Sequence, residues 1–346
     1  MARTRLTRLV LQVLLATALL AGSAAAQATK TSLRVADHYP ANASTANYTI
    51  KFFMNTVRQA SGGSVSFEYY PSEQLGKARD MLALTQQGVT DIGFIAPAYV
   101  SDKMPLSGVA ELPGTYSGSC QAVAGYWKLA KNGILADREF KTNGVRPLFA
   151  YLLQPYQILT RRPFVDVAAL RGLKLRSGGA AMDVTVRHLD GTPIRLGGAD
   201  VYSALSRGTI DGVVFPLAAV REFKLDELLR AGTLLENLGG FASVYAISEK
   251  RWSALPDDVR KVLDEAGEQT VLHACKISRR RSSRRWKASA RQDSYCSPYR
   301  LATMRKCRRR CAPCSRNGLR VLTRGGCREP RCSAPSWRRC RQRDHR

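Results

Sequence analysis

Short apolar runs alternate with amphipathic stretches from Leu33 to Ala274, and this alternation restricts the fold more than any other feature of the sequence. Residues 65–70 alternate with the two-residue period of a strand, whereas residues 257–273 have the helical period, begin with two acidic residues and follow a proline. Strands that alternate with helices are typical of α/β domains and not of β-sandwiches or helical bundles. We therefore predict an α/β fold for this part of the chain.

The same patterns give approximate positions for the elements. We expect a helix that Ser44 caps and Gly62-Gly63 ends. With 346 residues the chain is long enough for two lobes, and the strands near Pro147 and Phe215 are candidates for crossing between them. The other expected elements are strands at residues 33–38, 65–70, 91–95, 147–153, 173–176 and 213–215, and helices at residues 75–87, 199–207 and 257–273.

The first 26 residues have the composition of a secretory signal. Three arginines among the first eight residues precede an apolar run, and the small residues 22–26 follow it. We predict cleavage after Ala26, which makes the mature protein periplasmic. A membrane anchor needs about 20 apolar residues, and the run is shorter than that. We therefore expect no transmembrane segment after signal cleavage.

Residues 275–346 differ from the rest of the chain in charge and cysteine content. These 72 residues contain 21 Arg, 3 Lys and 3 acidic residues, a net +21 of the +27 of the whole chain, and eight of its nine cysteines. Three explanations stay open: a basic arm for nucleic acid or another polyanion, a metal site at Cys307, Cys311 and Cys314, or out-of-frame translation. We favour the last, because the segment has no apolar periodicity and because nothing in it indicates how an exported protein would pair these thiols.

The residues before this tail lack the motifs of common enzymes. Residues 1–274 contain no G-x-S-x-G, H-E-x-x-H or P-loop sequence, and their histidines are His38, His188 and His273. We expect no catalytic residues, no metal and no cofactor. Two rival functions stay open: a secreted protein that binds polyanions or nucleic acid through the Arg-rich tail, and an exported hydrolase that uses Cys120 or His38.

A set of short motifs points to a known family. In chain order they are His38-Tyr39-Pro40, Tyr70-Pro71-Ser72-Glu73-Gln74-Leu75-Gly76, Gln87-Gly88-Val89-Thr90-Asp91-Ile92-Gly93, Glu111-Leu112-Pro113, Leu170-Arg171-Gly172-Leu173-Lys174-Leu175-Arg176, Val201-Tyr202-Ser203-Ala204-Leu205-Ser206-Arg207-Gly208-Thr209-Ile210-Asp211-Gly212 and Ile247-Ser248-Glu249-Lys250-Arg251-Trp252-Ser253-Ala254-Leu255-Pro256. Over about residues 31–274 the chain thus resembles the substrate-binding proteins of TRAP transporters, the DctP-type periplasmic solute receptors. The tail does not resemble them.

The resemblance implies a two-lobed periplasmic-binding-protein-like fold with a hinge between the lobes. One lobe is expected to contain residues 31–152 and about 241–274, and the other residues 153–240. The implied function is extracytoplasmic solute binding: the protein captures a small organic acid and hands it to the membrane subunits of a TRAP transporter. No enzymatic activity is implied, and no nucleic acid is expected to bind the two lobes.

Arg176 is the candidate anchor of the ligand. Its guanidinium projects from a short expected strand beside Gly178-Gly179, and it can pair with both oxygens of a carboxylate, which lysine cannot do. The resemblance implies the same role, because the arginine of the Gly-Leu-Lys-Leu-Arg motif is the carboxylate anchor of the family.

Five further residues complete the expected site. The resemblance places His38 among the ligand contacts. It also places Phe215, Tyr156 and Ala96 where family members carry an asparagine, a second arginine and an acidic residue, and Gln154 lies near Tyr156 in sequence. Three polar positions have thus become apolar or aromatic while one arginine remains. Since unpaired polar groups are costly to bury, the site favours a monocarboxylate with an apolar or aromatic body over a dicarboxylate.

Overall fold

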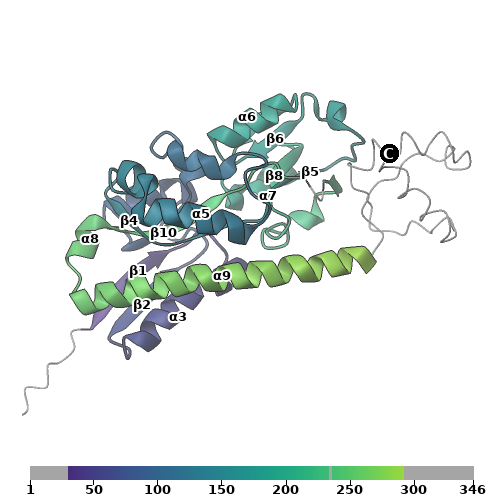
Figure 1. Cartoon of the computed structure of the whole chain (residues 1–346). Helices are drawn as coiled ribbons and strands as arrows, with labels where there is room; N and C mark the ends of the chain where they lie inside the picture. Colours follow the sequence, from purple (N-terminus) through teal and green to yellow (C-terminus); the bar gives the residue numbers. More distant parts are fainter. Residues whose placement is uncertain (1–29, 234–235, 292–346) are drawn as a thin grey trace, which may run out of the picture.

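The computed structural model describes residues 30–233 and 236–291 (Figure 1). The expected signal peptide at residues 1–26 lies outside the described residues, as does the part of the tail after Arg291.

Five strands form the first sheet, in the order β2-β1-β3-β10-β4. Their bounds are β1 Thr31–Ala36, β2 Val65–Tyr70, β3 Ile92–Ile95, β4 Val145–Leu152 and β10 Ala242–Ser248. Strand β1 pairs in parallel with β2 and β3, whereas β10 runs antiparallel to β3 and β4. Because β10 comes late in the sequence, the chain leaves this sheet and returns to it.

The second sheet has the order β7-β6-β8-β5-β9. Its strands are β5 Gln157–Thr160, β6 Lys174–Ser177, β7 Thr192–Arg195, β8 Gly212–Phe215 and β9 Ala231–Gly232. The chain crosses between the sheets after β4 and again before β10. The strand near Pro147 therefore does lead into a crossing, but the expectation for Phe215 is wrong, because β8 pairs with β5 and β6 inside the second sheet.

Helices cover both sheets, which confirms the two-lobed α/β fold. They are α2 Ser44–Tyr48, α3 Ile50–Ala60, α4 Met81–Gln86, α5 Ser119–Asn132, α6 Ala180–His188, α7 Val201–Ser206, α8 Glu249–Ser253 and α9 Asp257–Arg291. Ser44 is not the cap that we expected: it is the first residue of α2, which no side chain caps, and Thr49 separates α2 from α3. Helix α4 is also shorter than the helix predicted at residues 75–87.

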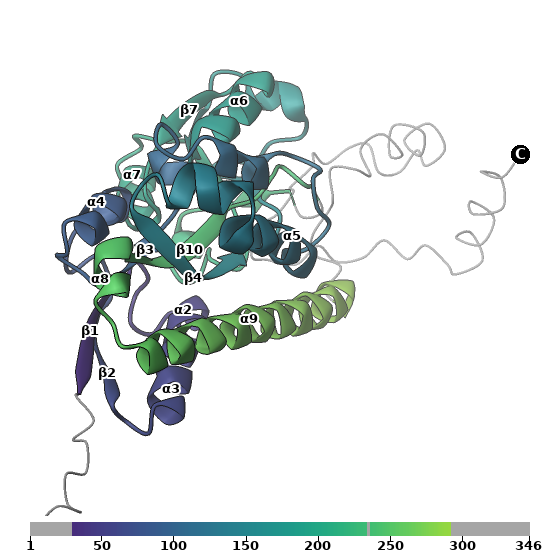
Figure 2. The same cartoon turned by 60° about the vertical axis from the view of Figure 1, so that its left-hand side comes forward.

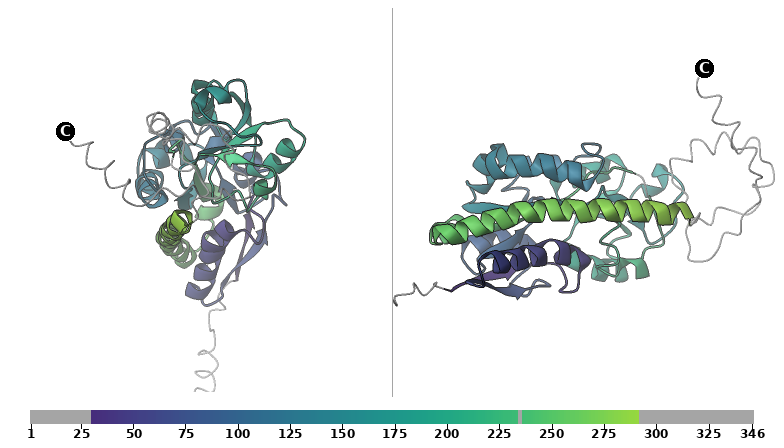
Figure 3. Two further views of the ribbon diagram at one scale, coloured as in Figure 1. Left: turned by 90° about the vertical axis from the view of Figure 1, so that its right-hand side faces the viewer. Right: turned by 60° about the horizontal axis from the view of Figure 1, so that its bottom comes forward.

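Helix α9 runs well past His273, where we expected it to end, and it includes the beginning of the Arg-rich tail. It lies between α3 and α5 and packs against β4 (Figures 1, 2 and 3). A Cβ atom on Gly267 would lie 2.0 Å from the carbonyl oxygen of Leu148, so the helix and the strand are in close backbone contact. A glycine is needed where backbones approach this closely.

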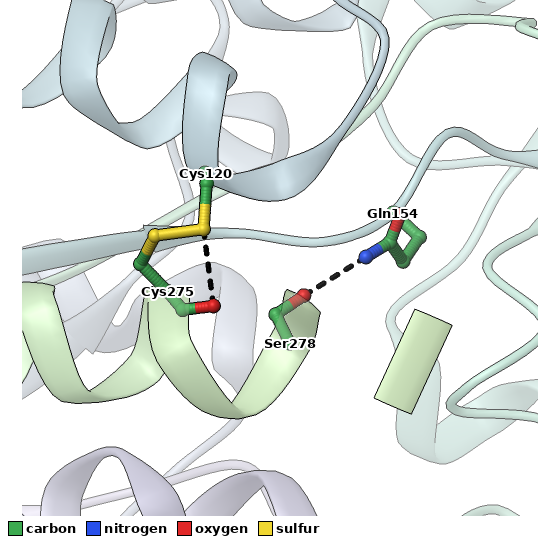
Figure 4. Close-up of a disulfide and its surroundings, with 4 residues drawn as sticks. All are labelled: Cys120, Gln154, Cys275 and Ser278. Carbon is green, nitrogen blue, oxygen red and sulfur yellow. Dashed lines mark hydrogen bonds between the residues drawn. A yellow bond between two sulfur atoms is a disulfide. The ribbon is translucent and has the colours of Figure 1, made fainter. Parts of the chain in front are cut away.

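A disulfide joins Cys275 of α9 to Cys120 in the first turn of α5 (Figure 4). The expectation that no tail thiol has a partner is therefore wrong for Cys275. The boundary between body and tail at residue 275 also does not coincide with a structural boundary, because the helix continues through it.

The turn that precedes β3 in the first lobe has the same geometry as the turn that precedes β8 in the second lobe. In the first lobe Gly88 has a φ of +74° and Asp91 accepts the backbone N–H of Arg34 at 2.8 Å. In the second lobe Gly208 has a φ of +73° and Asp211 accepts the backbone N–H of Lys174 at 2.9 Å. Glycine tolerates the positive φ, and the aspartate fixes the strand that follows against its neighbour.

Among the described residues, none of the helices combines the length and the apolar character that crossing a membrane requires.

Candidate ligand-binding site

Arg176 lies near the carboxyl end of β6, where the second lobe faces the first, and its side chain is 1% exposed. The guanidinium donates three hydrogen bonds to neutral acceptors. Nε donates to the carbonyl oxygen of Leu196 at 2.9 Å, Nη1 to that of Val214 at 3.4 Å, and Nη2 to the hydroxyl oxygen of Tyr99 at 3.2 Å. The strand and its neighbours thus hold the guanidinium in one orientation.

No carboxylate of the described part of the chain forms an ion pair with Arg176. A buried charge without a counter-ion is costly, and such charges are normally paired. A guanidinium has five N–H groups, and three of them are used here. The remaining two are one on each terminal nitrogen, which is the pattern that a carboxylate accepts with both oxygens.

Aromatic rings surround this guanidinium. Phe215, at the end of β8, lies with its ring centre 5.1 Å from the Arg176 guanidinium carbon. The ring centre of Tyr156 lies 6.2 Å from that of Phe215 and 6.2 Å from that of Phe241, on which it stacks. The ring of Tyr99 meets Phe241 edge-on, with the ring centres 5.1 Å apart. The structure therefore brings Arg176, Phe215 and Tyr156 together among aromatic rings.

His38 follows β1 and faces the second lobe. Its ring stacks on that of Phe94 with the ring centres 3.9 Å apart, and its centre lies 6.0 Å from that of Phe223 in the second lobe. Burial, together with the charge of Arg176, lowers the pKa of His38 to about 3, so the imidazole is neutral. Its Nδ1 atom is buried and has no hydrogen-bond partner among the described residues. A neutral imidazole with a free nitrogen can donate to or accept from a ligand.

The other two expected contacts lie in different surroundings. Ala96 is buried directly after β3, and its carbonyl oxygen accepts the backbone N–H of Tyr99 at 2.9 Å, the residue whose hydroxyl contacts the guanidinium. Gln154 instead donates from its side-chain amide to the hydroxyl of Ser278 on α9 at 2.9 Å (Figure 4). Gln154 is therefore bound to the last helix.

Several residues of the site were not singled out from the sequence. Tyr99 and Phe241 flank the guanidinium and the rings, and Glu111 is a buried carboxyl group close enough to Arg176 to sense its charge. Each comes from a segment distant in sequence from residue 176. Of these residues, only Glu111 stood in a motif that the sequence analysis named, at residues 111–113, and that motif gave Glu111 no part in ligand binding.

The two lobes touch directly around the site. Glu222 of the second lobe accepts hydrogen bonds from the backbone N–H and the hydroxyl of Thr45 in α2, both at 3.0 Å. Lys77 of the first lobe pairs with Asp200 of the second at 3.1 Å. The backbones of the two lobes also approach each other at Gly179, where a Cβ atom would lie 2.5 Å from the carbonyl oxygen of Ala98. These contacts belong to a closed arrangement of the lobes.

A surface pocket of about 620 Å³ lies elsewhere. Its lining includes Thr160, Leu173 and Asp211, which stand at the end of β5 and just before β6 and β8. Because Arg176 and Phe215 stand towards the other ends of β6 and β8, this pocket is at the opposite edge of the second sheet and is separate from the site.

The hydrolase alternative finds no support at Cys120. Its sulfur is bonded to Cys275 and is therefore not a free thiolate nucleophile. Within the described residues, no group of three or more His, Cys, Asp or Glu side chains is arranged to hold a metal ion.

Comparison with known proteins gives consistent relatives. The chain is 25% identical over 234 residues to a solute-binding protein of Albidiferax ferrireducens, which covers 66% of this chain and 68% of that protein. It is 24% identical over 217 residues to the sialic acid-binding periplasmic protein SiaP of Vibrio cholerae, and the match covers 62% of this chain and 67% of that protein. The matches span between 56% and 68% of the first three curated relatives.

Solved structures share the fold. A TRAP solute-binding protein of Rhodoferax ferrireducens, solved with copurified benzoate, is 25% identical with a TM-score of 0.66, covering 72% of this chain and 77% of that one. DctP7 of Bordetella pertussis, an extracytoplasmic solute receptor that binds pyroglutamic acid, is 20% identical with a TM-score of 0.68, covering 75% and 85%.

The family model described as bacterial extracellular solute-binding protein, family 7, matches residues 36–294. This range begins at the last residue of β1 and contains every other strand of both sheets and α9, so it extends beyond the limit at residue 274 that the motifs suggested. The fold, the relatives and the family model agree, and the chain belongs to the DctP family of solute-binding proteins, family 7.

Proposed function

We propose that this protein captures a small organic acid in the periplasm and delivers it to the membrane subunits of a TRAP transporter. The ligand is a monocarboxylate with an apolar or aromatic body. The observation that carries this proposal is Arg176, a guanidinium that is 1% exposed and has no ion pair with a described carboxylate. A carboxylate that accepts its two remaining N–H groups supplies the missing counter-ion.

The surroundings of Arg176 favour one carboxylate over two. Phe215, Tyr156 and Phe241 provide aromatic surface, and His38 is neutral. Arg195, another cation near this region, is already paired with Asp183 at 2.6 Å. A second ligand carboxylate would therefore be buried without a cation, which is costly. The benzoate held by the Rhodoferax protein is an acid of the favoured kind.

Closure of the lobes completes the proposed mechanism. We place the first lobe at residues 31–152 and about 241–274, and the second at residues 153–240. The ligand enters when the lobes are apart, and the carboxylate meets Arg176 on the second lobe. His38 and Ala96 of the first lobe then close over the aromatic body beside Phe215 and Tyr156. Gln154 is left out of this set because its amide is bound to Ser278.

Titration calorimetry on purified protein tests the proposal. Benzoate, 3-hydroxybenzoate and pyroglutamate are the monocarboxylate probes, and succinate is the dicarboxylate. We expect at least one monocarboxylate to bind and succinate to bind more weakly. Arg176→Lys keeps the charge but loses the fork, and losing a charged hydrogen-bond pair of about 2–3 kcal/mol lowers affinity on the order of 100-fold.

Arg171→Ala is the matched control, because that arginine lies in the same motif but its side chain is 80% exposed. Its affinity should equal that of the wild type. Circular dichroism and thermal unfolding establish that each variant is folded. Unchanged affinity in a folded Arg176→Lys protein contradicts the proposed anchor.

A further inference from the structure

Glu111 is a buried acid with an incomplete set of partners. It is the last residue of the short helix η4 Leu106–Glu111 in the first lobe, and it is 2% exposed. Its Oε2 atom is buried and has no hydrogen-bond partner among the described residues. A buried carboxylate in this situation loses its hydration without full compensation, so its charged form is disfavoured.

The carboxyl group of Glu111 lies against the second lobe. A Cβ atom on Gly179, the residue before α6, would lie 3.0 Å from Oε2, and the backbone N–H of Met182 in the first turn of α6 is near enough to favour the ionised form of the carboxyl group. The contact exists because Gly179 has no side chain. When the lobes separate, η4 and α6 part, and water reaches the carboxyl group.

The charges that face Glu111 come from several elements and partly cancel. Arg176 on β6 and Arg195 on β7 favour its ionised form, whereas Asp183 on α6 opposes it. Tyr116 and Tyr126, from the neighbouring loop and from α5, are buried phenols that feel its charge. Burial outweighs the arginines, so the pKa of Glu111 rises from an ordinary 4.5 to about 7 in the closed arrangement.

We propose that Glu111 takes up a proton when the lobes close over the ligand, so that capture of an organic acid is coupled to the binding of one proton. This inference rests on the proposed function. Arg176 supplies one buried positive charge, and the ligand carboxylate neutralises it. An ionised Glu111 would leave the closed site with an excess negative charge, whereas a protonated Glu111 leaves it neutral.

The direction of the pH dependence follows from the pKa of Glu111 in the two arrangements: about 7 when the lobes are closed, and the ordinary 4.5 when water reaches the carboxyl group. Below about pH 4.5 Glu111 is protonated with the lobes open or closed, and closure is favoured most. Between about 4.5 and 7 only the closed form holds the proton, so this contribution to affinity falls as pH rises. Above about 7 the contribution is lost. From pH 5.5 to 7.5 the loss is on the order of 20-fold.

Two other buried groups set the background. Burial also raises the pKa of Asp37, to about 6, but its hydrogen-bond donors Tyr39 and Tyr69 belong to the first lobe, so closure changes its surroundings little. His38 has a lowered pKa and faces Phe223 and Arg176 of the second lobe, so closure can release a proton from it. The effect of Glu111 must therefore be measured as a difference between proteins.

The experiment measures the number of protons that the protein takes up when it binds the ligand. Titration calorimetry at pH 6.5, in buffers of different ionisation enthalpy, gives this number. The probe is whichever of benzoate, 3-hydroxybenzoate and pyroglutamate binds the wild type. We expect Glu111→Gln to take up about 0.7 proton fewer than the wild type. Glu265→Gln, an exposed site on α9, should leave the number unchanged. Equal proton numbers for the wild type and a folded Glu111→Gln protein overturn the inference.

Failure of the proposed function looks different. If none of the three acids binds the folded wild type, the ligand class is wrong, whatever Glu111 does. The carboxyl carbon of Glu111 is then titrated by NMR in ligand-free protein that small-angle scattering shows to be closed. A pKa near 7 upholds proton uptake on closure, and a pKa near 4.5 overturns it.

Discussion

The hydroxyl oxygen of Tyr99 lies 3.2 Å from Nη2 of Arg176, across the boundary between the two lobes. Tyr99 belongs to the short helix η3 Pro97–Val100, which follows β3 of the first sheet, and Arg176 lies near the end of β6 of the second. The same hydroxyl oxygen also accepts the backbone N–H of Gly198 at 3.1 Å. Two donors of the second lobe thus converge on one oxygen of the first, and the proton of the hydroxyl remains available to a ligand oxygen.

Tyr99→Phe removes both interlobe hydrogen bonds and keeps the ring that packs against Phe241. Each hydrogen bond contributes about 0.5–1.5 kcal/mol, so we expect affinity for the bound acid to fall roughly tenfold. Titration calorimetry measures this. Tyr202→Phe is the control, because that hydroxyl contacts Glu227 within the second lobe. Equal affinities for the two variants would show that Tyr99 does not stabilise closure.

Gly179→Ala tests whether the lobes close as far as the structure shows. The added Cβ atom would lie 2.5 Å from the carbonyl oxygen of Ala98, which is backbone and cannot rotate away. We expect ligand affinity to fall at least tenfold while the thermal unfolding temperature changes little, since each lobe keeps its own packing. Gly125→Ala in α5, where the Cβ atom meets nothing within 4 Å, should bind normally. Normal binding by Gly179→Ala would contradict the closed arrangement as the bound state.

Local patterns predicted some of the strands and helices and missed others, including the strands β5, β7, β9 and β10. Residues 65–70 coincide with β2, because alternation over a half-buried strand is a local signal. Helix α6 was missed, since it follows Gly178-Gly179 and its buried apolar positions are only Met182 and Val186. Its packing against η4 of the other lobe depends on tertiary structure, which no window of sequence contains.

The end of α9 shows a similar limit. Apolar periodicity stops near His273, so the sequence predicts an end there. The helix continues because Cys275 bonds to Cys120 and because Ser278 accepts from Gln154. Both partners are more than a hundred residues away, and a pairing at that distance cannot be deduced from one sequence.

The site divides in the same way. Arg176 could be proposed as a carboxylate anchor from the sequence, because the residue type, the motif and the adjoining glycines all favour that role. Tyr99 and Glu111 could not, because their roles arise only where the first lobe meets the second. The role of Gln154 depends on Ser278, a residue in the segment that we assigned to the tail.

His38 should remain neutral over the physiological pH range. Its pKa is about 3 in the folded protein and near 6.5 when unfolded, so unfolding takes up a proton between these values. Stability is therefore lost as pH falls, by about 2 kcal/mol between pH 7 and 5 from this residue. NMR titration of the ring signals checks the first statement, with His38→Gln identifying the signal. A His38 signal that titrates near pH 6.5 would refute it.

The disulfide should be a main source of stability for the long last helix. It closes a loop with a sequence separation of 155 residues, and bridges typically contribute about 2–4 kcal/mol. In a protein of this size such a loss lowers the unfolding temperature by roughly 5–15 °C. We expect Cys120→Ala and Cys275→Ala to show the same decrease, and the double variant no further decrease, because either change removes the same bond. Thermal unfolding followed by circular dichroism measures all three. Additive decreases, or alkylation of Cys120 in the native, unreduced protein, would show that the two cysteines are not paired.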